Sequence, residues 1–150
     1  MKPVTPPAND VLLATYRAAR YRVYAPGREI LLRVDAFDAE LAKLLREAWV
    51  SSAALLTAWN PHSERRVDAI NQSQQARLEE ELQAGGYPCL RARNESGVDD
   101  STEWNEDSVL ALDLDLPAAH ALAARYGQLA FLWIDAEATP RLMVTAASPR

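Results

Sequence analysis

The fold is decided by the stretch AALLTAWNP, residues 53–61. Its apolar run is continuous rather than alternating, so it predicts a strand over 52–59 that is buried on both faces. Asn60 and Pro61 end this strand. The large ring of Trp59 and the amide of Asn60 suit a ligand-facing position at the strand exit. The alternative is that Trp59 is a core residue and that Asn60 only caps a turn.

The segments on either side of this strand alternate between strand and helix patterns. Asp38 is a plausible N-cap for a first core helix. Further strands are predicted over 20–25, 29–34, 87–93, 108–114, 129–134 and 141–145, and further helices over 63–84 and from Pro117 to Gly127. The order ββαβαββαββ, with an optional helix over 10–17, predicts an α+β fold in which about three helices pack on one mixed β-sheet.

Length and composition limit the class of protein to which this chain can belong. The 150 residues, 49% of them apolar, suffice for one domain with a full core. We expect this single domain over 10–146, a disordered lead-in over 1–9 and a short tail over 147–150. The N-terminus has no apolar h-region and no apolar run is long enough to span a membrane, so we expect no signal peptide and no membrane association. The single cysteine fits a reducing, cytoplasmic setting.

Metals and general nucleic-acid binding are not expected. The only cysteine, Cys89, cannot form an internal disulfide or a cysteine-based zinc cluster, and two distant histidines give no metal-ligand spacing. We therefore predict no metal and no cofactor. The net charge of −5 argues against general nucleic-acid binding, which needs many phosphate contacts.

Charge is unevenly distributed along the chain. Residues 94–107 form a predicted acidic loop with six acidic residues and no basic one, whereas residues 1–34 carry six basic and two acidic residues. The simpler interpretation is a solvated loop beside a basic face. The alternative is that the basic segment contacts an anionic ligand or the acidic loop itself.

The helix predicted over 63–84 carries amides in its apolar stripe. The stripe passes through Val67, Ile70, Leu78 and Leu82, and it includes Asn71 and Gln74, with Arg77 at its flank. Buried amides need hydrogen-bond partners. They are either structural, tying the helix to the sheet or to the Asn60 turn, or they line a cavity and bind a ligand.

Two further segments offer polar side chains next to apolar ones. Trp104 and Glu106 lie at the exit of the acidic loop. Burial beside Trp104 would raise the pKa of Glu106, which makes this residue the best candidate for a general base. The alternative is one more exposed acid. Gln128 precedes a buried strand, where its amide needs a polar pocket.

Several of these residues together resemble a known family. The pattern consists of Tyr16 and Tyr21, residues 57–61 with Ser63, Asn71 with Arg77 and Leu78, Trp104-x-Glu106-x-Ser108, and Gly127-Gln128-x-Ala130. In this order, from about Tyr16 to Val144, it is similar to the bacterial family known as domain of unknown function 3293. The resemblance implies a small bacterial single-domain protein and supplies no activity.

Two functions stay open at this point. The first is a pocket for a small polar or nucleotide-like ligand, built from Trp59, Asn60, Asn71, Glu106 and Gln128. In it Trp59 or Trp104 stacks on the ligand, and Arg17, Arg20 or Arg77 takes a phosphate. The second is a non-enzymatic module that contacts a protein partner and has structural amides. Exposed apolar residues on the first hairpin (Tyr21, Val23 and Tyr24) would support it. Whether the pocket catalyses a reaction is left open.

Overall fold

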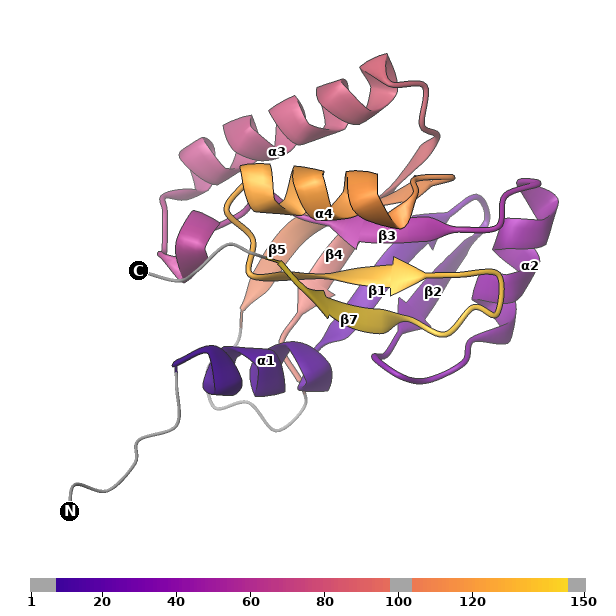
Figure 1. Cartoon of the computed structure of the whole chain (residues 1–150), viewed down its shortest axis with the longest axis horizontal. Coiled ribbons are helices and arrows are strands. Elements are labelled where there is room, and N and C mark those ends of the chain that lie inside the picture. The colour runs from indigo at the N-terminus through magenta and orange to yellow at the C-terminus, as the bar shows by residue number, and fades with distance from the viewer. Residues whose placement is uncertain (1–7, 98–103, 146–150) are drawn as a thin grey trace.

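A seven-stranded sheet is the centre of the computed structural model, which describes residues 8–97 and 104–145. The predicted lead-in, apart from Ala8 and Asn9, lies outside the described residues. So do the predicted tail and residues 98–103 of the predicted acidic loop. Figure 1 shows the sheet with helices on both of its faces.

The sheet has the strand order β2-β1-β4-β5-β3-β6-β7. The strands are β1 Arg20–Ala25, β2 Arg28–Leu32, β3 Ala53–Leu56, β4 Cys89–Glu95, β5 Asn105–Leu112, β6 Ala130–Ile134 and β7 Arg141–Val144. The helices are α1 Ala8–Ala18, α2 Ala39–Glu47, α3 Asp68–Ala84 and α4 Leu116–Arg125, with a short 3-10 helix, η1, over Pro61–Ser63. The predicted α+β class, its element order and the optional first helix are confirmed.

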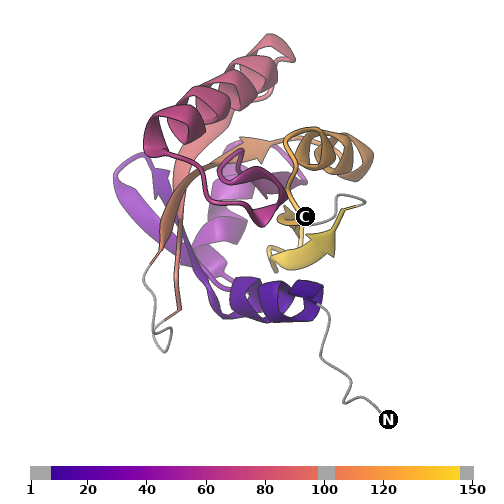
Figure 2. The same ribbon diagram turned by 90° about the vertical axis from the view of Figure 1, so that its left-hand side faces the viewer.

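Strand β3 lies in the middle of the sheet, between β5 and β6. Its four residues are buried, as the continuous apolar run predicts. Because side chains alternate between the two faces of a strand, β3 contributes to two cores. Leu55 belongs to a cluster that includes α2, and Leu56 to a cluster that includes α3 and α4. Figure 2 shows α3 and α4 on one side of the curved sheet and α1 on the other.

Local sequence signals mark the N-terminal ends of two helices, α2 and α4. The Asp38 carboxylate accepts a hydrogen bond from the Leu41 N–H at 2.9 Å, so Asp38 is the expected N-cap of α2. Asp115 caps α4 in the same way, with Pro117 in the first turn. These caps fix where the chain leaves the sheet and packs back onto it.

The sheet and one helix differ from the expectation in detail. All strand pairings in the described part of the chain are antiparallel, although a mixed sheet was expected. Helix α3 begins at Asp68 rather than near Ser63. The reason is backbone conformation, because Asn60, His62 and Ser63 all have positive φ and cannot continue a right-handed helix.

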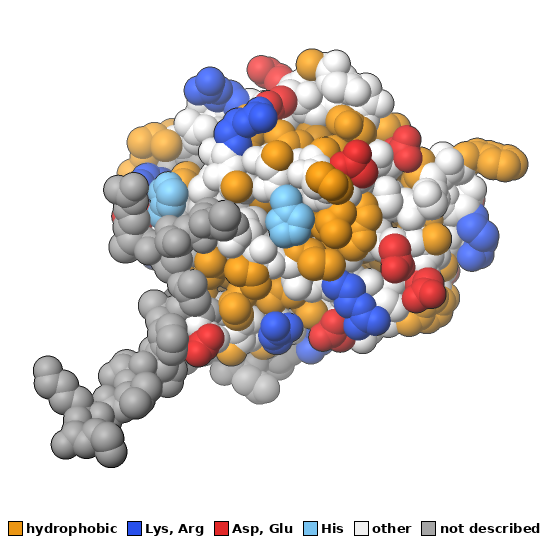
Figure 3. Space-filling view, in the orientation of Figure 1, with side chains coloured by type: hydrophobic (Ala, Val, Ile, Leu, Met, Phe, Trp, Pro, Cys, Tyr) orange, Lys and Arg blue, Asp and Glu red, His pale blue; other side chains and the backbone are white. Residues whose placement is uncertain are grey.

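The apolar residues of the first hairpin are mostly buried. Tyr21 is 4% exposed and Val23 is fully buried, so they do not form the exposed apolar face that a docking module would present. Figure 3 shows hydrophobic side chains over the α4 and β6–β7 region with charged side chains scattered around them. None of the helices in the described ranges is long and apolar enough to cross a membrane.

The turn after α4 packs directly against the loop after β3. Gly127 has φ +70°, and a Cβ built on it would lie 2.9 Å from the Cβ of Pro61. The carbonyl of Gly127 also accepts a hydrogen bond from the His62 N–H at 2.7 Å. Gly127 therefore ends α4 and allows the Asn60 loop to approach closely.

We predict that Gly127→Ala destabilises the protein more than Gly86→Ala. Both glycines have positive φ, but a Cβ at Gly86 would meet nothing within 4 Å. Gly86→Ala should cost about 1–2 kcal/mol through backbone strain alone. Gly127→Ala should cost a further ~1–3 kcal/mol because Pro61 must move. Urea unfolding of both variants measures the difference, and equal losses would contradict the packing role of Gly127.

Candidate functional site

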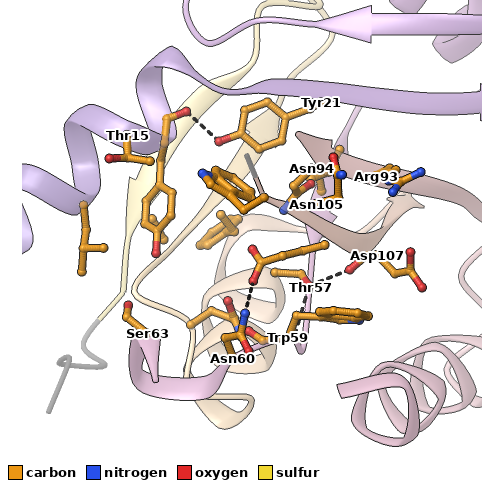
Figure 4. A pocket seen from close by; sticks show the side chains of 18 of the residues that line it. Thr15, Tyr21, Thr57, Trp59, Asn60, Ser63, Arg93, Asn94, Asn105 and Asp107 are labelled. Atoms are coloured by element: carbon orange, nitrogen blue, oxygen red, sulfur yellow. Dashed lines mark hydrogen bonds between the residues drawn. The ribbon is translucent and has the colours of Figure 1, made fainter. Parts of the chain in front are cut away.

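A cleft of about 720 Å³ opens where β3 ends. Its walls come from α1, the loop with η1, the start of β5 and the start of β6. Residues that share the floor and walls near the centre are Tyr16, Tyr21, Asn60, Asn94, Trp104 and Glu106. Figure 4 shows several of these side chains converging from different elements. A cleft of this size is in the range of small-molecule sites.

The carboxyl of Glu106 lies at the floor of the cleft. The Asn60 amide Nδ2 donates a hydrogen bond to Glu106 Oε2 at 2.9 Å. Burial raises the pKa of Glu106 to about 7, and the hydrogen bond from Asn60 partly opposes that shift. At neutral pH this carboxyl therefore exists in both protonation states, as a general acid or base requires.

Asn60 is fixed in place by the start of α3. Its backbone N–H donates to Asn71 Oδ1 at 2.9 Å, and Asn71 Nδ2 donates back to Asn60 Oδ1 at 2.9 Å. The Arg66 N–H donates to the same Asn60 oxygen at 2.9 Å. These bonds hold Asn60 at φ 48°, a left-handed conformation that asparagine tolerates better than most residues. They leave Nδ2 aimed at Glu106.

Asn71 stabilises the site without lining the cleft. It is 1% exposed, does not line the cleft, and also donates to the Arg66 carbonyl at 3.2 Å. Its two amide atoms are thus satisfied within the protein. Of the two interpretations of this helix, the geometry of Asn71 fits a tie between α3 and the Asn60 turn.

A second buried amide on α3 completes the end of β3. Gln75 Oε1 accepts a hydrogen bond from the Ala58 N–H at 2.8 Å. Gln75 is buried, whereas Gln74, placed in the stripe by the sequence, is only partly buried. Val67 and Ile70 are exposed by 64% and 50%, so the predicted stripe is wrong at its N-terminal end. The inward positions are Asn71, Gln75, Leu78 and Leu82.

Gln128 ties the start of β6 to the β3 exit. Its Nε2 donates to the Trp59 carbonyl at 2.9 Å and to the Tyr126 carbonyl at 3.2 Å. Gln128 also lines the cleft. The expected need for a polar environment is therefore met by two backbone carbonyls, one in the loop on which Asn60 lies and one at the end of α4.

The two tryptophans lie in different parts of the cleft. Trp104 lines it and packs against the core that includes Tyr21. Trp59 also lines it, but Figure 4 shows its indole on the side of Asp107. Trp59 Nε1 is buried and has no hydrogen-bond partner among the described residues. Trp104 is thus the better placed of the two predicted stacking residues.

Helix α1 closes the cleft from the other side. The Tyr21 hydroxyl donates to the Tyr16 carbonyl at 2.7 Å, which anchors the end of α1 to β1. Burial raises the pKa of the Tyr16 phenol above the usual range, and the Ser63 side chain near it partly opposes that shift. Tyr16 therefore links α1 to η1 across the cleft. The sequence named Tyr16 and Ser63 only within the family pattern and gave them no role.

Asn94 is the site residue that sequence reasoning missed. It lies directly opposite Glu106 in the β4–β5 register, is 7% exposed, and lines the cleft. Its Oδ1 is buried without a hydrogen-bond partner in the described part of the chain. The predicted acidic loop hid this position, because β4 extends to Glu95 and β5 begins at Asn105. Extending the strand alternation from Ala92 would have placed Asn94 on the inner face.

The arginines that we expected to bind a ligand phosphate do not line the cleft. Arg77 is exposed on α3 and does not line the cleft, and Arg17 and Arg20 do not line it either. Arg65, Arg66 and Arg93 line it instead, with Arg66 Nη2 2.9 Å from Glu64 Oε2. The basic N-terminal segment does contact the edge of the predicted acidic loop, because Arg22 pairs with Glu95 at 3.1 Å. This ion pair lowers the pKa of Glu95.

Comparisons with known proteins place the site inside a family. A family described as "Protein of unknown function (DUF3293)" matches residues 56–131, half of the chain. The match includes Asn60, Asn71, Glu106 and Gln128. No curated protein and no solved structure matches the chain. Within residues 8–97 and 104–145, no group of three or more His, Cys, Asp or Glu side chains could hold a metal ion.

We predict that Glu106→Gln changes how stability depends on pH. The pKa of Glu106 is raised in the folded state, so the folded protein binds more protons than the unfolded chain between its ordinary pKa of 4.5 and about 7. Glu106 should therefore lower wild-type stability as pH rises through this window, by up to roughly 3 kcal/mol. Glu106→Gln should gain stability relative to wild type from pH 5 to pH 8 in urea unfolding. A constant difference would contradict the raised pKa.

We also predict that Asn71→Ala disorders the Asn60 turn. The substitution leaves the Asn60 N–H and the Arg66 carbonyl without their partner, which should cost about 1–3 kcal/mol in unfolding free energy. Ser73→Ala is the matched control, because Ser73 is an exposed neighbour on α3, and it should change stability by less than ~0.5 kcal/mol. Amide exchange of residues 60–66 should rise in Asn71→Ala alone. Equal exchange in both variants would refute the support role.

Proposed function

We propose that this chain, which belongs to the DUF3293 family of proteins of unknown function, binds a small polar molecule in the cleft at the exit of β3 and exchanges a proton with it through Glu106. The observation that carries the proposal is the Asn60–Glu106 pair, in which a carboxyl of pKa about 7 faces a cleft. Perturbed carboxyls in clefts mark functional sites more often than structural ones.

The hydrogen-bond partner of Glu106 supports this role. A carboxyl needed only for folding would gain from a cation beside it, because an ion pair favours the charged form. The group that bonds Glu106 is instead the neutral amide of Asn60. This amide orients the carboxyl without fixing its charge, so Glu106 keeps both protonation states near neutral pH.

The chemistry that this arrangement supports is proton transfer to or from a bound molecule. A positioned general acid or base with a pKa near the working pH typically contributes ~10²–10⁴-fold to a reaction rate. Glu106 would carry the proton, Asn60 would orient it, and Asn71 would keep Asn60 in position. Asn60 and Asn71 are therefore positioning residues in this proposal.

The walls of the cleft favour a planar, polar ligand of moderate size. Tyr16 and Trp104 offer aromatic surface, and the volume of about 720 Å³ suits a ligand as large as a nucleoside. Two basic residues of the lining, Arg65 and Arg66, come from the segment between η1 and α3, and a third, Arg93, comes from β4. A phosphate or carboxylate on the ligand would find its counter-charge on these residues rather than at Arg77.

Thermal denaturation against a panel of nucleosides, nucleotides, sugars and polar metabolites tests the proposal. A true ligand at about 100 times its Kd adds ~2.7 kcal/mol of stability, which raises Tm by roughly 5–10 °C in a domain of this size. Glu106→Gln and Asn60→Gly should both lose this shift. Glycine is chosen at position 60 because it keeps the left-handed backbone while it removes the amide.

Asp113→Asn is the matched control for the loss of one negative charge. Asp113 is exposed in the turn that follows β5, and its φ of 67° suits asparagine as well. It should retain the full ligand shift. Stabilisation that survives in Glu106→Gln and Asn60→Gly, or a panel without any binder, would refute the proposed function.

A further inference from the structure

The floor of the cleft contains a buried amide that the fold does not use. Asn94 makes no hydrogen bond through its side chain within the described residues, and its Oδ1 is buried without a partner. Buried polar groups in folded proteins are nearly always paired. An unpaired one that lines a cleft points to a partner that arrives with a ligand.

Asn94 and Glu106 form one recognition unit. They are directly opposite each other on antiparallel strands, so their side chains leave the same face of the sheet as close neighbours. Asn60 occupies Glu106 Oε2, and Oε1 has no partner among residues 8–97 and 104–145. Two acceptor atoms, Glu106 Oε1 and Asn94 Oδ1, are therefore available side by side.

Several of the donors around these acceptors are already engaged. The Tyr21 hydroxyl donates to the Tyr16 carbonyl, and the Asn60 amide donates to Glu106. The Thr57 hydroxyl donates to the Asp107 carbonyl at 2.7 Å, and Gln128 donates to two carbonyls. Figure 4 shows the Tyr21, Asn60 and Thr57 bonds as dashed lines. The unpaired acceptors Glu106 Oε1 and Asn94 Oδ1 therefore favour a ligand that brings donors. Trp59 Nε1 is an unengaged donor of the same cleft among the described residues, but Figure 4 shows its indole on the side of Asp107.

We propose that the cleft recognises a planar head group with adjacent N–H donors, of the amidine or guanidine type, which bonds Glu106 and Asn94 together. This inference rests on the proposed function and names the class of its ligand. Tyr16 and Trp104, which line the same cleft, offer aromatic faces to a planar or cationic head of this kind.

The affinity for this kind of head group should depend on pH in a way that the affinity for other head groups does not. A ligand that donates to Glu106 favours the ionised carboxylate, so its affinity should rise with pH through the titration of that group. A ligand that presents a carbonyl or carboxylate needs the protonated form and should lose affinity over the same range. The sign of the pH dependence therefore separates the two classes.

Three isosteric probes test the inference: benzamidinium, benzamide and benzoate. They share one ring and differ in whether the head offers donors, both kinds of atom, or acceptors. NMR titration of the full chain should show benzamidinium binding at least ~10-fold more tightly than benzoate at pH 8. Its affinity should rise roughly tenfold from pH 6 to pH 8, because the ionised fraction of a group with a pKa of about 7 rises by that factor.

Variants assign the contacts to residues. Glu106→Gln should weaken benzamidinium at least ~10-fold and abolish the pH dependence, while Asp113→Asn keeps both. Asn94→Leu should weaken it about fivefold or more. Its Tm should equal or exceed that of wild type, because it removes an unpartnered buried amide and keeps the side-chain volume. A fall in Tm with unchanged affinity would assign Asn94 to folding and overturn the inference.

The remaining outcomes separate this inference from the proposed function. Tighter binding of benzoate than of benzamidinium, strengthening as pH falls, would overturn the donor-rich head and leave a Glu106 site in place. Benzamidinium binding that is the same in Glu106→Gln as in wild type would also overturn it. If none of these probes and no member of the metabolite panel binds, both proposals fall.

Discussion

The hydrogen bond from Asn60 to Glu106 is the interaction on which the rest of the site depends. It joins the loop after β3 to the start of β5, two segments that meet only because the sheet places β3 beside β5. Asn60 reaches Glu106 because Asn71 and the Arg66 backbone hold it in a left-handed conformation. A left-handed residue that is pinned on three sides cannot relax when Glu106 changes charge, so the carboxyl keeps its orientation in both protonation states.

The surrounding contacts make this loop rigid rather than mobile. Gln128 bonds the Trp59 carbonyl, and Gly127 comes close enough to Pro61 that no side chain fits between them. Tyr16 reaches Ser63 from the opposite wall. The loop is thus fixed at Trp59 and Pro61 by the turn between α4 and β6, and at Ser63 by α1. Functional groups held by packed elements keep their geometry better than groups on free loops.

Sequence patterns predicted the fold because its strongest signals are local. The continuous apolar run at β3, the N-cap Asp38 and the glycine that ends α4, Gly127, determine the element order. They could not show that Asn60, His62 and Ser63 take positive φ, which delays α3 to Asp68 and turns Gln75 inward in place of Gln74. Asn60 and Glu106 stood out as polar residues beside large rings. Asn94 did not, because its importance arises only from its cross-strand neighbour, Glu106.

The polar side chains of the site fall into two physical classes according to their hydrogen-bond partners. Asn71 bonds Asn60 and Arg66 through both amide atoms, and Gln128 bonds backbone carbonyls, so each stabilises the fold by satisfying groups that would otherwise be orphaned. Glu106 and Asn94 differ, since the first is largely buried without a cation bonded to it and the second is buried without a partner among the described residues. Retaining both lowers the stability of the free protein. A ligand that pairs with them would recover that free energy on binding, which links the weakest part of the core to the function of the cleft.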